Sequence, residues 1–200
     1  MCPFCYIGKR RLETALKQYD ARGETVEIIW RSFQLDPDLE TNEHVTVTES
    51  LAMKKGWSLA QTRQIMSQVV SMAAAEGLTY DFDRAVVANS FDAHRFTHYA
   101  KSHNLQDAAE ERLFAAYFTE GKNTADIETL ATLGAEIGLN KKAVSEVLQK
   151  DTFADAVEID IALAQVFGIR AVPFFVFNSR FAVSGAQDVA VVLDTMEKAR

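Results

Sequence analysis

CPFCYIGKRR, at residues 2–11, contains both cysteines of this 200-residue chain and is its most informative segment. Two cysteines separated by two residues can exchange a disulfide or supply half of a metal site. Pro3 stands just inside the start of a helical pattern, where its missing N–H costs nothing. Apolar residues then recur at helical spacing over residues 7–19. We therefore expect a helix that carries the cysteine pair at its amino terminus and ends at Gly23.

The position of the two thiols predicts a different role for each. The positive end of the helix dipole and the unpaired N–H groups favour a thiolate at Cys2, and the thiolate is the nucleophile in disulfide exchange. Cys5 lies one turn further on, close enough to resolve a mixed disulfide. We expect Cys2 to be the exposed attacking sulfur and Cys5 the more buried one. Because Phe4 brings no positive charge, we expect a Cys2 pKa of about 5–7 and a reduction potential of roughly −150 to −250 mV.

The composition argues against several classes of partner. The formal net charge is −7 and no basic block offsets it, which argues against nucleic acid and against an anionic membrane. No apolar run approaches the roughly 20 residues of a membrane helix, and the amino terminus lacks the apolar region of a signal peptide. We interpret Lys9, Arg10 and Arg11 as a solvated helix face. The expected location is a reducing cytoplasm, where a disulfide is usually catalytic or redox-sensing.

The middle of the chain is dominated by helical patterns. Residues 25–30 (TVEIIW) are rich in β-branched residues and predict a strand. From residue 45 to residue 150 we expect no strand, and Thr124 or Asp126 is a plausible helix start. The helical periods in this region cover residues 59–75, 91–102, 108–118, 127–137 and 141–149.

Strand signals return near the carboxyl end. Residues 152–167 predict a helix that stops at Gly168, and residues 187–198 predict another. Between them, two short apolar runs at 173–177 and 181–183 flank the turn sequence NSR and indicate a hairpin. We interpret this order as an α/β domain, made of residues 1–40 and 151–200, that is interrupted by a helical insertion domain at residues 41–150.

Pro173 is the first residue of the apolar run at 173–177. A proline there marks a strand start or an edge strand, or else a cis peptide bond. Beside a cysteine pair, a cis bond would leave the Val172 backbone exposed for pairing with a substrate chain and would keep a metal from settling on the thiols. The residues alone leave both readings open.

The two cysteines have two alternative uses. Cys5 could be a small buried hydrophobe. His94 and His98 stand four apart on a predicted helix and could formally complete a zinc site with the two cysteines. They lie much further along the chain than in a compact zinc finger, so we expect no metal. His44 and His103 are expected to face solvent.

Four segments together resemble the FrnE-type branch of the DsbA family. They are CPFCYIGKRR at residues 2–11, NSFDAHR at 89–95, VPFFVF at 172–177 and VSGAQ at 183–187, and the resemblance spans essentially the whole chain. It implies an α/β thioredoxin-like fold with a large helical insertion. It also implies a thiol–disulfide oxidoreductase of the reductase or isomerase type, with Cys2 as nucleophile, Cys5 as resolver and Pro173 in cis.

The resemblance further assigns residues around the cysteine pair. Asn89, Phe91 and His94 would face the pair from the insertion, although Phe91 could instead be core and Asn89 or Ser90 a helix cap. Ser184 and Gln187 would lie near the proline loop. The substrate-binding residues expected from all these arguments are Pro3, Phe4, Val172, Pro173, Asn89, His94 and Gln187.

The expected substrates are protein or small-molecule thiols and disulfides. No cofactor is expected beyond the redox-active pair, glutathione is a candidate co-substrate, and the protein is expected to be a monomer or homodimer. The family has a strand before the cysteine motif where only Met1 stands here, so we expect the native start to lie upstream. Two alternatives remain: a glutathione-dependent enzyme of the 2-hydroxychromene-2-carboxylate isomerase or kappa-class transferase type, which characteristically has serine in place of Cys2, and a zinc-held interaction module.

Overall fold

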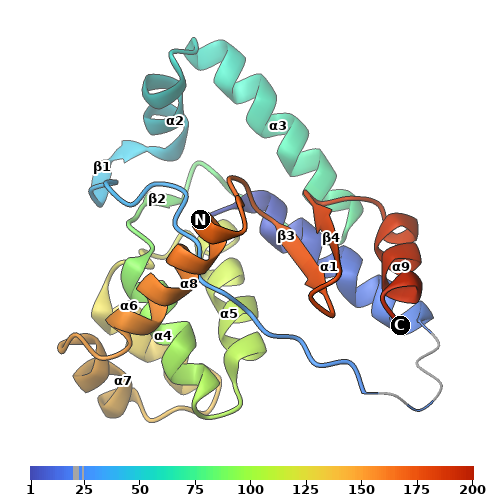
Figure 1. The fold of residues 1–200 in the computed structure, drawn as a ribbon. Helices are drawn as coiled ribbons and strands as arrows, with labels where there is room; N and C mark the ends of the chain where they lie inside the picture. Colours follow the sequence, from blue (N-terminus) through green and yellow to red (C-terminus); the bar gives the residue numbers. More distant parts are fainter. Residues whose placement is uncertain (20–22, 24) are drawn as a thin grey trace.

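The structure is a computed structural model that describes residues 1–200 except 20–22 and 24 (Figure 1). Helices predominate, and the described strands form two small antiparallel sheets, β1 with β2 and β3 with β4. In chain order the elements are α1 (Pro3–Gln18), β1 (Asn42–Thr46), α2 (Val47–Lys55), α3 (Leu59–Ala75), β2 (Val86–Val87), α4 (Phe91–Lys101), α5 (Gln106–Phe118), α6 (Ile127–Glu136), α7 (Lys141–Leu148), α8 (Ala154–Val166), β3 (Phe174–Phe177), β4 (Phe181–Ser184) and α9 (Val189–Lys198).

The first helix begins earlier than its apolar periodicity suggests. Cys2 is the N-cap residue, with extended backbone angles (φ −99°, ψ 118°), and Pro3 is the first helical residue. Proline is favoured at this position because its fixed φ suits the helix and its missing N–H would have had no partner. The helix therefore starts at the cysteine motif itself and places Cys2 at its end.

The carboxyl-terminal hairpin is confirmed. β3 and β4 pair in the register Phe174↔Ser184 through Phe177↔Phe181. Asn178 and Ser179 in the turn both adopt positive φ, a conformation that asparagine tolerates better than most residues. The hairpin packs beside α1 and α9 around a buried cluster of Leu12, Ala15, Val192 and Met196.

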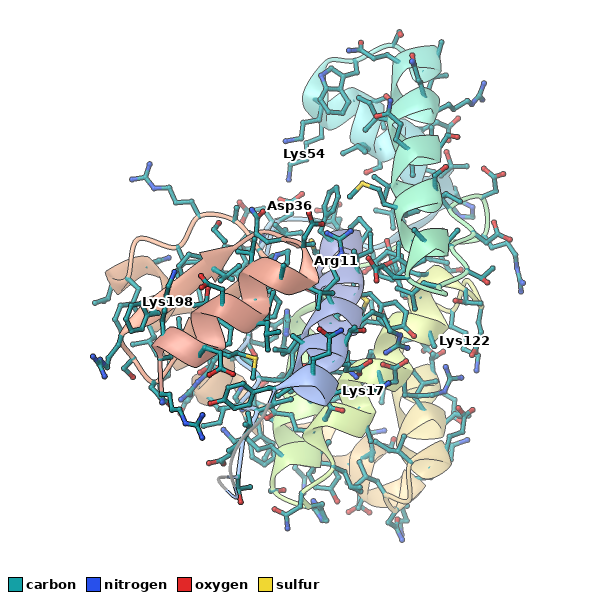
Figure 2. All side chains as sticks on the ribbon, turned by 90° about the vertical axis from the view of Figure 1, so that its right-hand side faces the viewer. Arg11, Lys17, Asp36, Lys54, Lys122 and Lys198 are labelled. Atoms are coloured by element: carbon teal, nitrogen blue, oxygen red, sulfur yellow. The ribbon has the colours of Figure 1, made fainter. Side chains whose placement is uncertain are left out.

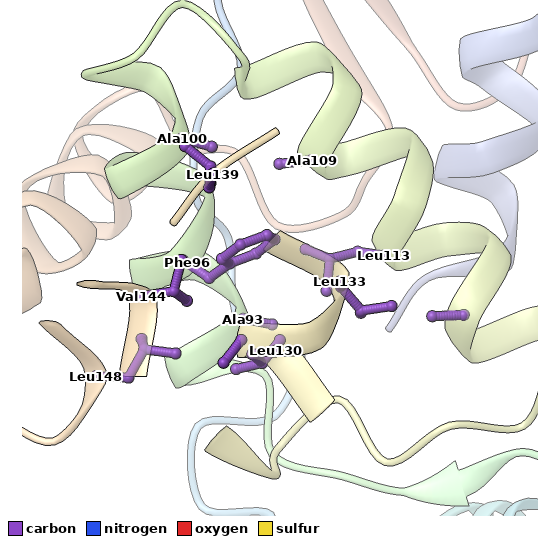
Figure 3. Packing of buried hydrophobic residues seen from close by; sticks show 12 residues of the cluster. Ala93, Phe96, Ala100, Ala109, Leu113, Leu130, Leu133, Leu139, Val144 and Leu148 are labelled. Atoms are coloured by element: carbon purple, nitrogen blue, oxygen red, sulfur yellow. The ribbon is translucent and has the colours of Figure 1, made fainter. Parts of the chain in front are cut away.

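A second core holds α4, α5, α6 and α7 together (Figure 3). Phe96 is completely buried at its centre, next to Leu133 and Val144. Gly134 permits this close packing, since a Cβ there would lie 2.9 Å from the Val144 side chain. The expected helix start at Asp126 is also confirmed, because its carboxylate accepts a hydrogen bond from the Thr129 N–H at 2.8 Å.

An arm formed by α2 and α3 extends away from the rest of the molecule (Figures 1 and 2). A capping box between Thr46 and Glu49 starts α2, and Gly56 ends it in the left-handed conformation. The expected helix over 59–75 is confirmed as α3. Sequence periodicity missed α2, because a helix of nine residues with few buried side chains presents almost no apolar stripe.

Two strand predictions are wrong. Residues 25–30 are extended but form no ladder, and Val26, Ile28 and Ile29 are exposed. β-branched residues favour a pleated surface only where a neighbouring strand completes the hydrogen bonds, and no described segment does so here. Conversely, the region expected to lack strands contains β2 and the last two residues of β1, an irregular pair whose segments are too short to show an alternating pattern. Within the described residues, no helix has both the length and the hydropathy needed to cross a membrane.

Candidate active site

The cysteine pair lies against the loop that precedes β3. The Cys2 thiol donates a hydrogen bond to the Val172 carbonyl oxygen, with 3.4 Å between Sγ and O. The Val172–Pro173 peptide bond is cis. The Pro173 carbonyl in turn accepts the Gly185 N–H at 2.8 Å, which fixes the loop to the end of β4. Residues 170 positions apart in the sequence therefore meet at the attacking sulfur.

Glycine at position 8 makes this approach feasible. A Cβ on Gly8 would lie 3.1 Å from the Pro173 ring and 3.1 Å from the Phe175 ring. These separations are tighter than ordinary van der Waals contact, so a side chain would push α1 away from the proline loop. Gly8 is a positioning residue for the site that periodicity analysis did not identify.

The two thiols differ strongly in acidity. A hydrogen bond from the Cys5 thiol and the Cys5 and Phe4 backbone N–H groups outweigh the opposing effect of burial and lower the pKa of Cys2 to about 7. The same sulfur–sulfur hydrogen bond, together with burial and the nearby Glu110 carboxylate, raises the pKa of Cys5 well above its ordinary value. The thiolate therefore forms on Cys2, at the upper end of the range expected from the sequence.

The expected difference in exposure is wrong. Cys2 is buried, with 9% of its surface accessible, whereas Cys5 is partly exposed. The expectation treated a helix end as a solvent-facing position, but the Val172 loop and the walls of a cavity cover Cys2. Phe4 is the motif residue that does face solvent, at 37% exposure. The acidity of Cys2 thus comes from its hydrogen bonds, not from exposure.

A cavity of about 130 Å³ opens beside both sulfurs. The cysteine helix and Val172 form one wall, the extended segment before β1 forms another, and α4 and α5 form the third. Its lining residues are Met1, Cys2, Cys5, Trp30, Arg31, Phe33, Leu35, Asp36, Leu39, Ala88, Ser90, Ala93, His94, Thr97, Glu110, Leu113, Phe114 and Val172. The site is therefore built between the cysteine helix and the inserted helices.

His94 lines this cavity, but His98 does not. Burial lowers the pKa of His94 to about 4, so its imidazole is neutral at pH 7. His98 faces away, and its Nε2 lies 3.1 Å from the Ser32 hydroxyl and 3.2 Å from an Asp160 carboxylate oxygen. The described residues contain no group of three or more His, Cys, Asp or Glu side chains placed to hold a metal. His44 and His103 are exposed, as expected.

Asn89 acts on the cavity wall and does not line the cavity itself. Its Nδ2 donates to the Leu39 carbonyl at 2.9 Å and to the Pro37 carbonyl at 3.1 Å. Its Oδ1 accepts the Phe91 N–H at 2.9 Å, an Asx-type bond from the residue before the N-cap Ser90, whose own side chain makes no capping bond. Asn89 therefore ties residues 34–41, which carry Leu35, Asp36 and Leu39, to the start of α4.

The remaining expected site residues lie around the cavity rather than in it. The Pro3 carbonyl accepts the Tyr80 hydroxyl at 2.7 Å. The Gln187 side chain donates to the Ser184 carbonyl at 2.9 Å and so supports the end of β4 behind the proline loop. Phe91 is partly buried outside the cavity.

The basic residues after the motif are not a solvated face. Lys9 is 4% exposed, and its Nζ lies 3.0 Å from Glu111, which also pairs with Arg10. Arg11 pairs with Glu76 of the α3 C-cap at 2.6 Å. Burial alone would raise the pKa of Glu111, but hydrogen bonds from Arg10, Tyr6 and Lys9 lower it to about 2. The expectation was wrong because local charge does not reveal that α5 and α3 place acidic groups against this side of α1.

Glu110 is a second site residue that sequence reasoning missed. It lines the cavity, where burial raises its pKa to about 7 against the opposing effect of a hydrogen bond with Thr97. In the sequence it is one of two adjacent glutamates on an ordinary amphipathic helix. Its neighbour Glu111 faces the cations of α1. The orientation of α5 about its own axis therefore places Glu110 in the cavity and Glu111 against α1.

Comparison with known proteins gives a consistent result. The family described as "DSBA-like thioredoxin domain" matches residues 1–197. A solved structure of a probable DsbA oxidoreductase from Streptomyces coelicolor is 33% identical, with a TM-score of 0.91, and the match covers 99% of this chain and 85% of that one. The Bacillus subtilis (strain 168) protein YwbO is 28% identical over 180 residues, which cover 89% of this chain and 82% of YwbO.

A more distant structure shares the fold. 2-Hydroxychromene-2-carboxylate isomerase is 16% identical with a TM-score of 0.70, over 98% of this chain and 90% of that chain. The expected fold class, a thioredoxin fold with a helical insertion, is confirmed by these matches.

Proposed function

Because the chain belongs to the DSBA-like thioredoxin domain family, we propose that it is a thiol–disulfide oxidoreductase in which Cys2 attacks and Cys5 resolves. The observation that carries the proposal is the opposed acidity of the two thiols. A Cys2 pKa of about 7 leaves a large thiolate fraction at neutral pH, while the Cys5 proton is retained.

The reaction runs in two balanced steps. The Cys2 thiolate attacks one sulfur of a substrate disulfide, a mixed disulfide forms, and the other substrate sulfur leaves as a thiolate. Cys5 then loses its proton and attacks Cys2 Sγ, which forms the Cys2–Cys5 disulfide and releases the second substrate thiol. Two electrons pass from the cysteine pair to the substrate, and the reverse sequence oxidises a dithiol.

The proline loop supplies a second element of the proposal. The Val172 carbonyl lies at the attacking sulfur, so the backbone of this loop is a candidate pairing site for an extended substrate segment. Pro3, Phe4 and Pro173 would border that segment. We assign Asn89 and Gln187 a supporting role, because their amides are occupied by bonds to the loops they hold.

The finer assignments are also proposals. We infer membership of the FrnE-like branch, reductase or isomerase direction, a cytoplasmic location, and a division into a thioredoxin-like domain at 1–40 and 151–200 with an insertion at 41–150. Glutathione is the candidate co-substrate, no metal is required, and the protein would act as a monomer or homodimer. The retained Cys2/Cys5 pair favours disulfide exchange over the glutathione-dependent isomerase and transferase chemistry.

Two measurements test the proposal. The protein should catalyse insulin reduction by dithiothreitol, and equilibration with glutathione should give a potential of roughly −150 to −250 mV. Cys2→Ser should abolish exchange, whereas Cys5→Ser should accumulate mixed disulfides. Lack of exchange in the wild type, or stoichiometric zinc that survives dialysis and protects both thiols, would contradict it.

A further inference from the structure

Glu110 is an acid without a cationic partner inside the cavity. Among the described residues, no nitrogen of a lysine, an arginine, a histidine or the amino terminus lies within the 4.0 Å of an ion pair with its carboxylate. The nearby Lys9 ammonium contacts Glu13, Asp107 and Glu111 instead, and Arg31 contacts Asp160. The cavity therefore contains an acidic group that forms no ion pair with any described residue.

The other cavity walls do not compensate for this charge. Ala93, Leu113, Phe114 and Val172 are apolar, and His94 is neutral at pH 7 because burial lowers its pKa to about 4. The two other basic groups of the lining are Arg31, which pairs with Asp160, and the Met1 amino group, whose pKa burial also lowers. A carboxylate in such surroundings is poorly solvated and gains most from a cation that enters with a ligand. The ligand that complements this cavity thus carries a positive charge on a short apolar stem.

The size of the cavity limits the length of that stem. A cavity of about 150 Å³ is known to hold a benzene molecule, and this one is about 130 Å³. It therefore accommodates a fragment of roughly four to six non-hydrogen atoms. Both cysteines also line it, so the same fragment presents its sulfur at the reacting thiol.

We propose that the cavity binds the ammonium end of a small aminothiol, so that disulfides of the cystamine type are preferred substrates, with Glu110 as the specificity-determining residue. This inference rests on the proposed function. In the first step Cys2 joins one aminothiol half in a mixed disulfide while the other half leaves as a thiolate. Cys5 then displaces the bound half, two thiols are produced, and dithiothreitol returns the oxidised pair to the dithiol in an assay.

The test compares three disulfides that differ in end-group charge. Reduced protein is mixed at pH 8 with cystamine, bis(2-hydroxyethyl) disulfide or dithiodiglycolate, and the oxidised pair is quantified by mass after acid quenching. Each rate constant is divided by that of Glu110→Gln, which cancels the intrinsic reactivity of the disulfide. We expect this ratio to be about tenfold higher for cystamine than for the neutral compound, the size typical of one charge-assisted hydrogen bond, and lowest for the anion.

The controls separate recognition from other roles. Glu146→Gln, an exposed acid on α7, should leave all three rates unchanged. Ethylammonium should slow the wild-type reaction with cystamine, whereas ethanol should not, and this comparison needs no variant. Equal ratios for the three disulfides would indicate that Glu110 transfers protons and does not recognise the ammonium group, and would overturn the inference. Equal inhibition by ethylammonium and ethanol would also overturn it. Failure of the wild type with every disulfide would instead refute the proposed function.

Discussion

At the residue scale, the acidity of Cys2 depends mainly on its neighbour. The hydrogen bond from the Cys5 thiol is the largest influence that lowers the pKa of Cys2. Removal of this donor in Cys5→Ala should therefore raise the midpoint of the pH dependence of Cys2 alkylation from about 7 toward the ordinary thiol value. Iodoacetamide labelling followed by mass spectrometry measures that midpoint.

Cys5→Ser is the matched control for this prediction, since serine keeps a hydrogen-bond donor at the same place. Its midpoint should stay closer to the wild-type value than that of Cys5→Ala. In the wild type, Cys2 should be alkylated before Cys5 even though Cys2 is the more buried residue. Equal midpoints in the two variants would show that the backbone N–H groups alone set the acidity.

A second prediction at this scale concerns Gly8. Alanine normally stabilises a helix relative to glycine by about 0.5–1 kcal/mol, but at this position its Cβ meets Pro173 and Phe175 at 3.1 Å. We expect Gly8→Ala to lower the free energy of unfolding by about 1–3 kcal/mol, as overpacking does. Urea denaturation measures the sign of this change in the free energy of unfolding. A net gain in stability would mean that the proline loop moves to accommodate the Cβ without loss of free energy.

At the element scale, the cavity wall formed by residues 34–41 depends on side-chain hydrogen bonds. It has no helix or strand ladder of its own before β1, and Asn89 holds two of its carbonyl groups. Figure 2 places Asp36 of this segment near Lys54 of α2, and the two form an ion pair. The wall is therefore attached at two points to the inserted helices.

Asn89→Ala should loosen this wall without changing the chemistry of the thiols. We expect faster hydrogen exchange over residues 34–41 and faster alkylation of Cys2, while the alkylation midpoint remains at about 7. Asn89→Asp retains the acceptor for the Phe91 N–H but turns a charged oxygen toward the Pro37 and Leu39 carbonyls, so it should loosen the wall at least as much as Asn89→Ala. A shifted midpoint would contradict a purely positional role.

At the scale of the whole molecule, two adjacent glutamates should give opposite pH dependences of stability. The pKa of Glu110 is raised to about 7, so the native state binds its proton more tightly than the unfolded state, and this contribution to stability is lost as pH rises from about 4 to 7. The pKa of Glu111 is lowered to about 2, so its contribution is present above about pH 4 and is lost as pH falls toward 2.

Gln substitutions at the two positions measure this contrast. The free energy of unfolding of Glu110→Gln, relative to wild type, should increase between pH 5 and pH 8 by up to about 3 kcal/mol. Glu111→Gln should be destabilised at pH 7, and the difference from wild type should shrink toward pH 3. Urea titrations across this range test both signs, and parallel pH profiles for the two variants would disprove the assigned environments.

The sequence by itself determined the features that depend on neighbouring residues in the chain. The motif CPFCYIGKRR, its place at a helix start, most of the helices and the β3–β4 hairpin follow from local periodicity, capping and turn chemistry. The family resemblance predicted that His94 faces the cysteine pair, and in the structure His94 lines the same cavity as both cysteines. These signals are local, so one sequence carries them without knowledge of the packing.

Only the tertiary structure decided how buried each group is and which distant groups meet. Residues 25–30 have the composition of a strand but no described partner to complete its hydrogen bonds. Cys2 is covered by a loop 170 positions away, and Lys9 is buried against acids of α5. Glu110 and Glu111 differ only in the direction in which α5 presents their side chains. Burial and charge partners set their pKa values, and both are properties of the packed elements and not of the local sequence.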